Sequence, residues 1–253
     1  MIGMHVTPHI RLTVPHWYNF DDSIRPHART LEGAASWDEL RMRDESGAFG
    51  LGATVEEWRL RASSQADLQS RAATIGNLLR GWGTRKLVSV GVGNGMLEYL
   101  VKQKASEIEV RCGDYAPRSL AALRERFPDC SSVELMDLRR FDWTQEPGEV
   151  VLFHRVDMEL RNSEWKDVFS GLANRGVERI IWVPCGLLNA AAIGGQVRAV
   201  LTAITARRRL TRTGYLRSQA RMLSLFAPHY RRSTVRSEGD LPIWALAKER
   251  RRP

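Results

Sequence analysis

Short, nearly continuous apolar runs alternate with amphipathic stretches along the middle of this 253-residue chain. Short apolar runs predict strands that are buried on both faces, and apolar residues at every third or fourth position predict helices that cover a sheet. The expected strands are 86–90, 107–112, 132–136, 149–153 and 179–183, and the expected helices between them are 96–104, 117–127 and 163–174. This alternation predicts an α/β fold with a parallel sheet and helices on both faces.

The two ends of the chain depart from this pattern. Residues 1–55 contain three prolines and clustered glycines, so an irregular N-terminal extension is expected there, followed by a helix over 54–79. After residue 183 the pattern predicts two helices and then two strands, at 190–208, 216–226, 231–236 and 242–247. The turn at 237–240 contains glycine and joins the last two as a hairpin, which gives the sheet an antiparallel strand. The chain therefore divides into an extension, 1–55, and one domain, 56–253.

A glycine loop follows the first expected strand. The strand runs directly into Gly91, Gly93 and Gly95, and a helix begins after them. Glycines let a ligand approach the backbone closely beside a helix N-terminus. In the dinucleotide-binding fingerprint the third glycine comes three positions after the second, and here Met96 holds that position. The loop, with Val90 before it and Asn94 within it, is therefore a candidate cofactor site, but not for a dinucleotide.

Acidic residues follow the next two expected strands. Asp114, with Tyr115 beside it, comes where an open α/β sheet can bind the ribose hydroxyls of a nucleoside, although an Asp there can also cap the next helix. Asp137 could accept a hydrogen bond from an adenine amine while Leu138 packs on the ring. The alternative is that Asp137 is a turn residue, and Asp142 is a nearby competitor.

In this order, the glycine loop, Asp114, Asp137 and the apolar fourth strand resemble the class I S-adenosylmethionine (SAM)-dependent methyltransferases. The resemblance covers roughly 78–247 and implies a Rossmann-like, seven-stranded, mostly parallel sheet with a reversed strand near its end. It implies SAM as the cofactor, with the glycine loop on the methionine side, Asp114 on the ribose and Asp137 on the adenine. The family often has an acid two residues before the first glycine, and this chain has Ser89 there.

The fourth strand leads into His154, where the resemblance places the methyl acceptor and one end of the cofactor. An imidazole titrates near neutrality, so His154 could take a proton from an acceptor hydroxyl or amine, with Asp157 or Glu159 orienting it. The alternatives are a structural hydrogen bond for His154 and exposed or Arg-paired acids. No Asn/Asp-Pro-Pro-aromatic sequence follows this strand, which counts against methylation of base amines.

Four aromatic residues of the extension could cover the SAM sulfonium through cation–π attraction, or could simply pack the extension onto the domain. They are Trp17, Tyr18, Phe20 and Trp37. The second role, packing, is the favoured interpretation.

Charge is spread unevenly along the chain. Its net charge is +9, yet residues 198–253 alone hold fourteen Lys or Arg and three acids, a surplus of eleven. A basic region can bind nucleic acid, so an RNA-directed methyltransferase is one alternative, and a non-catalytic SAM-binding protein is another. Because the basic residues lie within the predicted catalytic domain, the favoured function is methyl transfer to an oxygen or nitrogen of a small molecule.

Composition narrows the cellular setting. The three cysteines, Cys112, Cys130 and Cys185, are widely spaced, which is typical of a reducing compartment and matches no metal-ligand pattern. No apolar run approaches the roughly 20 residues of a membrane span, and residues 1–11 lack signal-peptide character. The expected location is the cytoplasm, no metal site is predicted, and the oligomeric state is left open.

Overall fold

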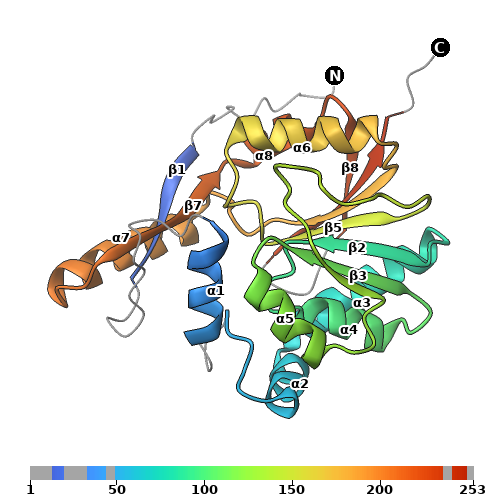
Figure 1. Cartoon of the computed structure of the whole chain (residues 1–253). Helices are drawn as coiled ribbons and strands as arrows, with labels where there is room; N and C mark the ends of the chain where they lie inside the picture. The colour runs from blue at the N-terminus through green and yellow to red at the C-terminus, as the bar shows by residue number, and fades with distance from the viewer. Residues whose placement is uncertain (1–12, 20–32, 44–48, 236–240, 250–253) are drawn as a thin grey trace, which may run out of the picture.

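A computed structural model describes residues 13–19, 33–43, 49–235 and 241–249 (Figure 1). A seven-stranded sheet forms its centre, in the spatial order β4 (Ser132–Leu135), β3 (Glu109–Asp114), β2 (Lys86–Val90), β5 (Val150–His154), β6 (Arg179–Val183), β9 (Ile243–Lys248), β8 (Tyr230–Val235). The first five strands are parallel, and β9 runs antiparallel to both of its neighbours. This arrangement confirms the predicted seven-stranded, mostly parallel sheet and its reversed strand.

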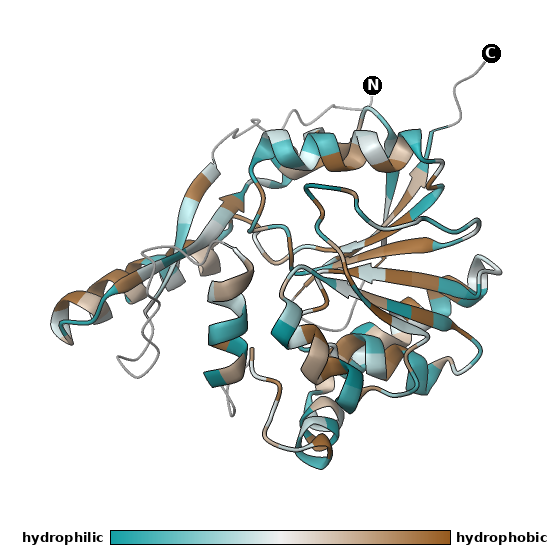
Figure 2. Ribbon diagram, in the orientation of Figure 1, coloured by the Kyte–Doolittle hydropathy of each residue, from teal (hydrophilic) through white to brown (hydrophobic). Residues whose placement is uncertain are grey.

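Helices cover both faces of the sheet, as the alternating pattern predicts. One face carries α2 (Val55–Ser64), α3 (Ala66–Gly81), α4 (Met96–Lys104) and α5 (Pro117–Arg126), and the other carries α6 (Asn162–Asn174) and α8 (Gln219–Phe226). In β5, Val150 and Leu152 pack on the first face while Val151 and Phe153 pack on the second, and all four are at most 1% exposed. The apolar central strands lie between these two helical layers (Figure 2).

A smaller arm projects from this body. It consists of β1 (Thr13–Asn19) paired antiparallel with β7 (Leu210–Arg217), and α7 (Ala190–Thr205) packs along β1. The prediction of an irregular extension over 1–55 was therefore wrong in part. These residues include β1 and a helix, α1 (Ala34–Arg43), that contacts α5. Phe20 and the turn at 237–240 lie outside the described residues.

Predicted helix bounds differ from those in the structure by up to three residues, as in α7, which ends at Thr205 and not at 208, and two differences have a clear local cause. The stretch expected as one helix over 54–79 is two helices, because Gln65 adopts extended backbone angles between them. The helix expected to begin at 216 begins at Gln219 instead, after Ser218 caps it, because the preceding residues pair with β1. None of the helices in the described part of the chain has both the length and the apolar character needed to cross a membrane.

Candidate active site

The glycine loop joins β2 to α4 at the carboxyl edge of the sheet. Gly91 and Gly95 adopt positive φ angles of 81° and 68°. A Cβ atom at Gly91 would lie 2.3 Å from Cγ1 of Val156, and one at Gly95 would lie 2.5 Å from Cδ1 of Leu123. Both positions therefore need glycine twice over, for the backbone angle and for the close approach of neighbouring segments.

Neighbouring elements hold this loop in place. The backbone N–H groups of Gly91 and Val92 donate to the carbonyl of Gly113 in β3, at 2.7 and 3.1 Å. The indole N–H of Trp58 in α2 donates to the carbonyl of Asn94 at 2.8 Å, and the Asn94 side chain accepts from the N–H of Met96. The loop is thus fixed to a strand on one side and a helix on the other.

Asp114 is the last residue of β3 and is buried against the glycine loop. Its Oδ2 accepts from the N–H of Gly93 at 3.0 Å, and its Oδ1 accepts from the N–H of Ala116, the residue that precedes α5, at 3.0 Å. The same Oδ1 lies 3.2 Å from Nη1 of Arg41 in α1. The structure therefore brings Asp114 to the glycine loop, in contact with the start of the next helix and with a cation from the N-terminal region.

A narrow pocket of about 30 Å³ lies beside Asp114. Six of the residues that the sequence assigned to the cofactor line it, namely Val90, Gly91, Asp114, Tyr115, Asp137 and Leu138. Met136, Val156 and Leu160 complete its apolar walls. Asp142 does not compete with Asp137 for the pocket, since its carboxylate accepts from the N–H of Asp137 at 2.9 Å and so shapes the turn that places Asp137.

A second pocket, of about 110 Å³, lies over the glycine loop and contains His154 and Asn94. Trp37 of α1 and Phe49 form part of its wall, with ring centres 6.1 Å apart, and Tyr18 of β1 packs edge-on against Phe49. Of the four aromatic residues considered for a lid, Trp37 lines this pocket, Tyr18 supports it, and Trp17 lies in β1 beside α7.

His154 ends β5, and its Nε2 is buried without a hydrogen-bond partner among the described residues. Burial lowers the pKa of His154 well below 6.5, and the nearby charges of Arg155 and Arg71 lower it further. The imidazole is therefore neutral at neutral pH, with a nitrogen that is free to take part in a hydrogen bond.

Asp157 is fully buried a few residues later, and its carboxylate faces the loop that follows β6. It accepts from the N–H groups of Cys185 and Gly186 at 2.9 and 2.7 Å, while its carbonyl accepts from Trp165 and Arg217. Asp157 is not among the residues that line either pocket. These contacts give it a role in fixing the loops around the site.

Among the charged residues that were not assigned to the cofactor from the sequence, two are shared by the two pockets. Arg41 and Glu159 both line both pockets. Tyr115 donates from its hydroxyl to Glu159 at 3.1 Å, and burial raises the pKa of Glu159 to about 7. Arg41 had no local signal in the sequence, because its partner Asp114 is far along the chain.

In the family that the sequence resembles, an acid is common at the position that Ser89 occupies here. In this structure an acid from another element, Glu98, lies next to Ser89. The Ser89 hydroxyl donates to Oε1 of Glu98 in α4 at 2.7 Å. Glu98 is only 1% exposed, and burial raises its pKa to about 7. A carboxyl group therefore lies beneath the glycine loop, although it comes from the following helix.

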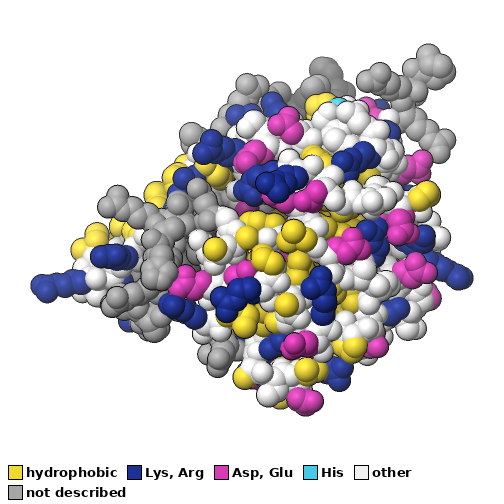
Figure 3. All heavy atoms as spheres, viewed as in Figure 1, with side chains coloured by type: hydrophobic (Ala, Val, Ile, Leu, Met, Phe, Trp, Pro, Cys, Tyr) yellow, Lys and Arg dark blue, Asp and Glu magenta, His cyan; other side chains and the backbone are white. Residues whose placement is uncertain are grey.

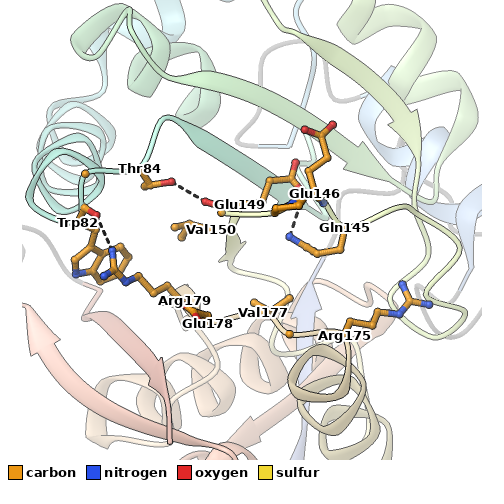
Figure 4. A pocket seen from close by; sticks show the side chains of 14 residues that line it. Trp82, Thr84, Gln145, Glu146, Glu149, Val150, Arg175, Val177, Glu178 and Arg179 are labelled. Carbon is orange, nitrogen blue, oxygen red and sulfur yellow. Dashed lines mark hydrogen bonds between the residues drawn. The ribbon is translucent and has the colours of Figure 1, made fainter. Parts of the chain in front are cut away.

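A larger cavity of about 610 Å³ opens at the opposite, amino edge of the sheet (Figure 4). Its polar groups bind one another: Arg179 donates to the carbonyl of Trp82, Thr84 to that of Gly148, and Gln145 to Glu149. Because most of these groups are paired within the described part of the protein, with Oε1 of Gln145 the exception, the two smaller pockets at the carboxyl edge form the better candidate site.

The fold resembles those of known methyltransferases at low sequence identity. Human N-acetylserotonin methyltransferase, solved in complex with SAM, aligns with a TM-score of 0.56 and 11% identity over 85% of this chain and 56% of its own. The mitomycin 7-O-methyltransferase MmcR aligns with a TM-score of 0.58 and 16% identity over 87% and 65%. PigF, solved with S-adenosylhomocysteine (SAH), aligns with a TM-score of 0.53 and 16% identity over 66% and 51%.

The chain has the class I SAM-dependent methyltransferase fold. It spans 51% to 65% of the length of these three neighbours. No protein-family model matches the sequence, and a comparison by sequence with curated proteins finds no match. The similarity therefore lies in the three-dimensional arrangement of the elements.

Proposed function

We propose that this chain is a SAM-dependent methyltransferase that acts on an oxygen or nitrogen of a small molecule. The observation that carries the proposal is the place of Asp114, whose carboxylate is bonded to the glycine loop and borders an apolar pocket edged by Asp137. Structural neighbours that hold SAM or SAH support the same cofactor.

The chemistry of these residues fits the cofactor. The Asp114 carboxylate suits the ribose hydroxyls, Asp137 suits the adenine amine, and the apolar walls around Leu138 suit the face of the ring. Gly93 exposes backbone at the loop, where a Cβ atom would meet only the end of the Arg41 side chain, 3.8 Å away. When bound, SAM supplies a methyl group on a sulfonium that is already a good leaving group, so the protein has mainly to position the acceptor and exclude water.

His154 is the proposed general base on the acceptor side. Its neutral imidazole lines the second pocket and has an Nε2 without a hydrogen-bond partner among the described residues, so it can accept a proton from a hydroxyl or amine. Trp37 and Phe49 form part of the wall of this pocket. Asp157 acts indirectly, by holding the loop after β6.

The small-molecule acceptor is favoured over RNA by the distribution of the basic residues. On the face shown in Figure 3, Lys and Arg side chains alternate with acidic ones over the body. Within the basic C-terminal region, Arg217 is fully buried and Arg231 pairs with Glu249. Arg217 is therefore not available to bind a phosphate backbone, and the charge of Arg231, which is 82% exposed, is partly neutralised by Glu249.

Calorimetry with SAH tests the proposal, with a nicotinamide dinucleotide as the control ligand. We expect binding of SAH with micromolar-scale affinity, about −8 kcal/mol, and none of the dinucleotide. Binding of the dinucleotide alone would overturn the proposal. SAM binding without turnover on any acceptor would instead favour a non-catalytic SAM-binding protein.

Asp114→Ala is the matching variant. Hydrogen bonds to a charged group contribute about 1.5–3 kcal/mol each, so SAH affinity should fall at least tenfold. Asp129→Ala, which removes an exposed acid after α5, is the control and should bind SAH like the parent. Equal SAH affinity of Asp114→Ala and the parent would show that another group binds the ribose.

A further inference from the structure

Arg41 of α1 lies across the middle of the candidate site. Its guanidinium is 6% exposed and lies 3.2 Å from the Asp114 carboxylate, which is 1% exposed. Its Nη2 also lies over the glycine loop, 3.8 Å from where a Cβ atom of Gly93 would be. The Arg41 guanidinium is therefore already paired with Asp114, the carboxylate that binds the ribose under the proposed function.

The two pockets are separated by this side chain. Arg41, Gly91, Val156 and Glu159 line both of them, which makes the pockets two parts of one channel. Their volumes are about 30 and 110 Å³, whereas sites for cofactor-sized ligands measure about 300–1,000 Å³. At these volumes neither pocket admits a nucleoside cofactor, and the Arg41 guanidinium lies on the carboxylate where the ribose would bind.

A separate contact, about one helical turn before Arg41, anchors α1 to α5. The Asp38 carboxylate accepts from the backbone N–H groups of Arg118 and Ser119 at 3.1 and 2.7 Å, and also from the Ser119 hydroxyl. No side chain of its own caps α5, so Asp38 supplies the missing cap at that positive helix end. Trp37 and Leu40 pack with Ala116 beside it.

Asp38 and Arg41 are three residues apart and therefore lie on the same face of α1. One contact docks the helix on α5, and the other places a guanidinium in the channel. The guanidinium also lies 5.4 Å from the centre of the Trp37 ring, which helps to hold it there.

We propose that Arg41 is a built-in competitor for the cofactor, which holds Asp114 in the cofactor-free protein and must leave it before the ribose can bind. This inference rests on the proposed function. Arg41 neutralises a buried carboxylate that would otherwise lie unpaired beneath the loop. The ribose hydroxyls must displace this ion pair, so part of the binding free energy is used for that exchange, and the affinity is lower than the contacts alone would give.

The test compares SAH binding to the parent, Arg41→Ala, Arg41→Gln and the control Arg43→Ala. Arg43 lies on the same helix but pairs with Glu39 at the surface, with 47% of its side chain exposed. Calorimetry gives the affinity and stopped-flow fluorescence gives the association rate. Arg41→Gln keeps a long polar side chain without the charge, and serves if the alanine variant folds poorly.

Both Arg41 variants should bind SAH at least tenfold more tightly than the parent and associate faster, and Arg43→Ala should match the parent. SAH binding by the two Arg41 variants, with none by the parent or by Arg43→Ala, would support the inference equally. Equal or weaker binding by the Arg41 variants, with the parent binding SAH, overturns the inference and leaves the proposed function intact. Absence of SAH binding in all four proteins overturns the proposed function and this inference together.

Discussion

Glu98→Gln should remove a pH dependence of stability that originates beneath the glycine loop. Glu98 is 1% exposed, and burial raises its pKa from 4.5 to about 7, although the Ser89 hydroxyl donates to it. Below pH 4.5 the group is protonated in both the folded and the unfolded chain. Between pH 4.5 and 7 the unfolded chain releases this proton while the folded protein keeps it, so the free energy of unfolding falls as the pH rises.

The size of this loss follows from the shift. A difference of about 2.5 pKa units corresponds to a loss on the order of 3 kcal/mol, complete above about pH 7. Glutamine has nearly the same shape, can still accept from Ser89 through its amide oxygen, and never ionises. The stability of Glu98→Gln relative to the parent should therefore rise by about 3 kcal/mol between pH 4.5 and pH 8.

Urea denaturation at a series of pH values measures this difference directly. Glu159, whose pKa is also raised to about 7, contributes to the slope in both proteins and cancels in the comparison. Glu125→Gln, at an exposed position of α5, is the control and should follow the parent. Parallel stability profiles for the parent and Glu98→Gln would refute the reasoning, because they would mean that Glu98 ionises in the folded protein without loss of stability.

Two further predictions concern the loop and the proposed base. Gly91→Ala would put a Cβ atom 2.3 Å from Val156 on a residue whose φ is 81°. We therefore expect a loss of about 2–5 kcal/mol in the free energy of unfolding, measured by denaturation, and loss of SAH binding, measured by calorimetry. Gly176→Ala has the same φ with open space around it and should lose only about 1–2 kcal/mol, so equal losses would contradict the packing argument. Once an acceptor is known, His154→Ala should lower turnover about 10²–10⁴-fold with SAH affinity unchanged. In the parent the turnover rate should fall only below pH 6.5, because the pKa of His154 is lowered and the imidazole stays neutral above that pH. A rate that already falls with decreasing pH above 6.5 would point to another base.

The central sheet could be predicted from the sequence because its signals are local. β2, β6 and α4 have the bounds that their apolar runs predict, since glycine, proline or charged residues border each run. Partners that are distant in the sequence left no such signal. β1 contains Pro15 and forms its pairs with β7, almost two hundred residues later, so nothing near it indicates a strand. The Thr-Arg-Thr alternation at 211–213 could have indicated β7, but the apolar period of the next helix masked it.

The candidate site likewise contains residues that the sequence indicates and residues that it does not. The glycine loop, Asp114 and Asp137 each lie at or just after the end of a strand, so their placement at one edge of the sheet follows from the order of the strands. Their roles as cofactor ligands stay predictions. Arg41 could not be found from the sequence, because α1 buries Asp38 and Arg41 together with Trp37 and Leu40, and a helix with charged and apolar residues on one face has no clear amphipathic pattern.

Besides the glycine loop, the second pocket has walls from three parts of the chain that are far apart in the sequence. Trp37 and Phe49 come from the N-terminal region, His154 and Met158 from the segment that ends β5, and Thr213 from β7 in the arm. The narrow pocket beside Asp114, apart from Arg41, is built by the sheet and its loops alone. Enzyme engineering could therefore vary the walls that belong to the second pocket alone, while the four residues that line both pockets stay constant. A library aimed at new acceptors would have to vary the N-terminal region and the arm together, since β1 and β7 are one sheet, while the residues that follow β2, β3 and β4 stay constant.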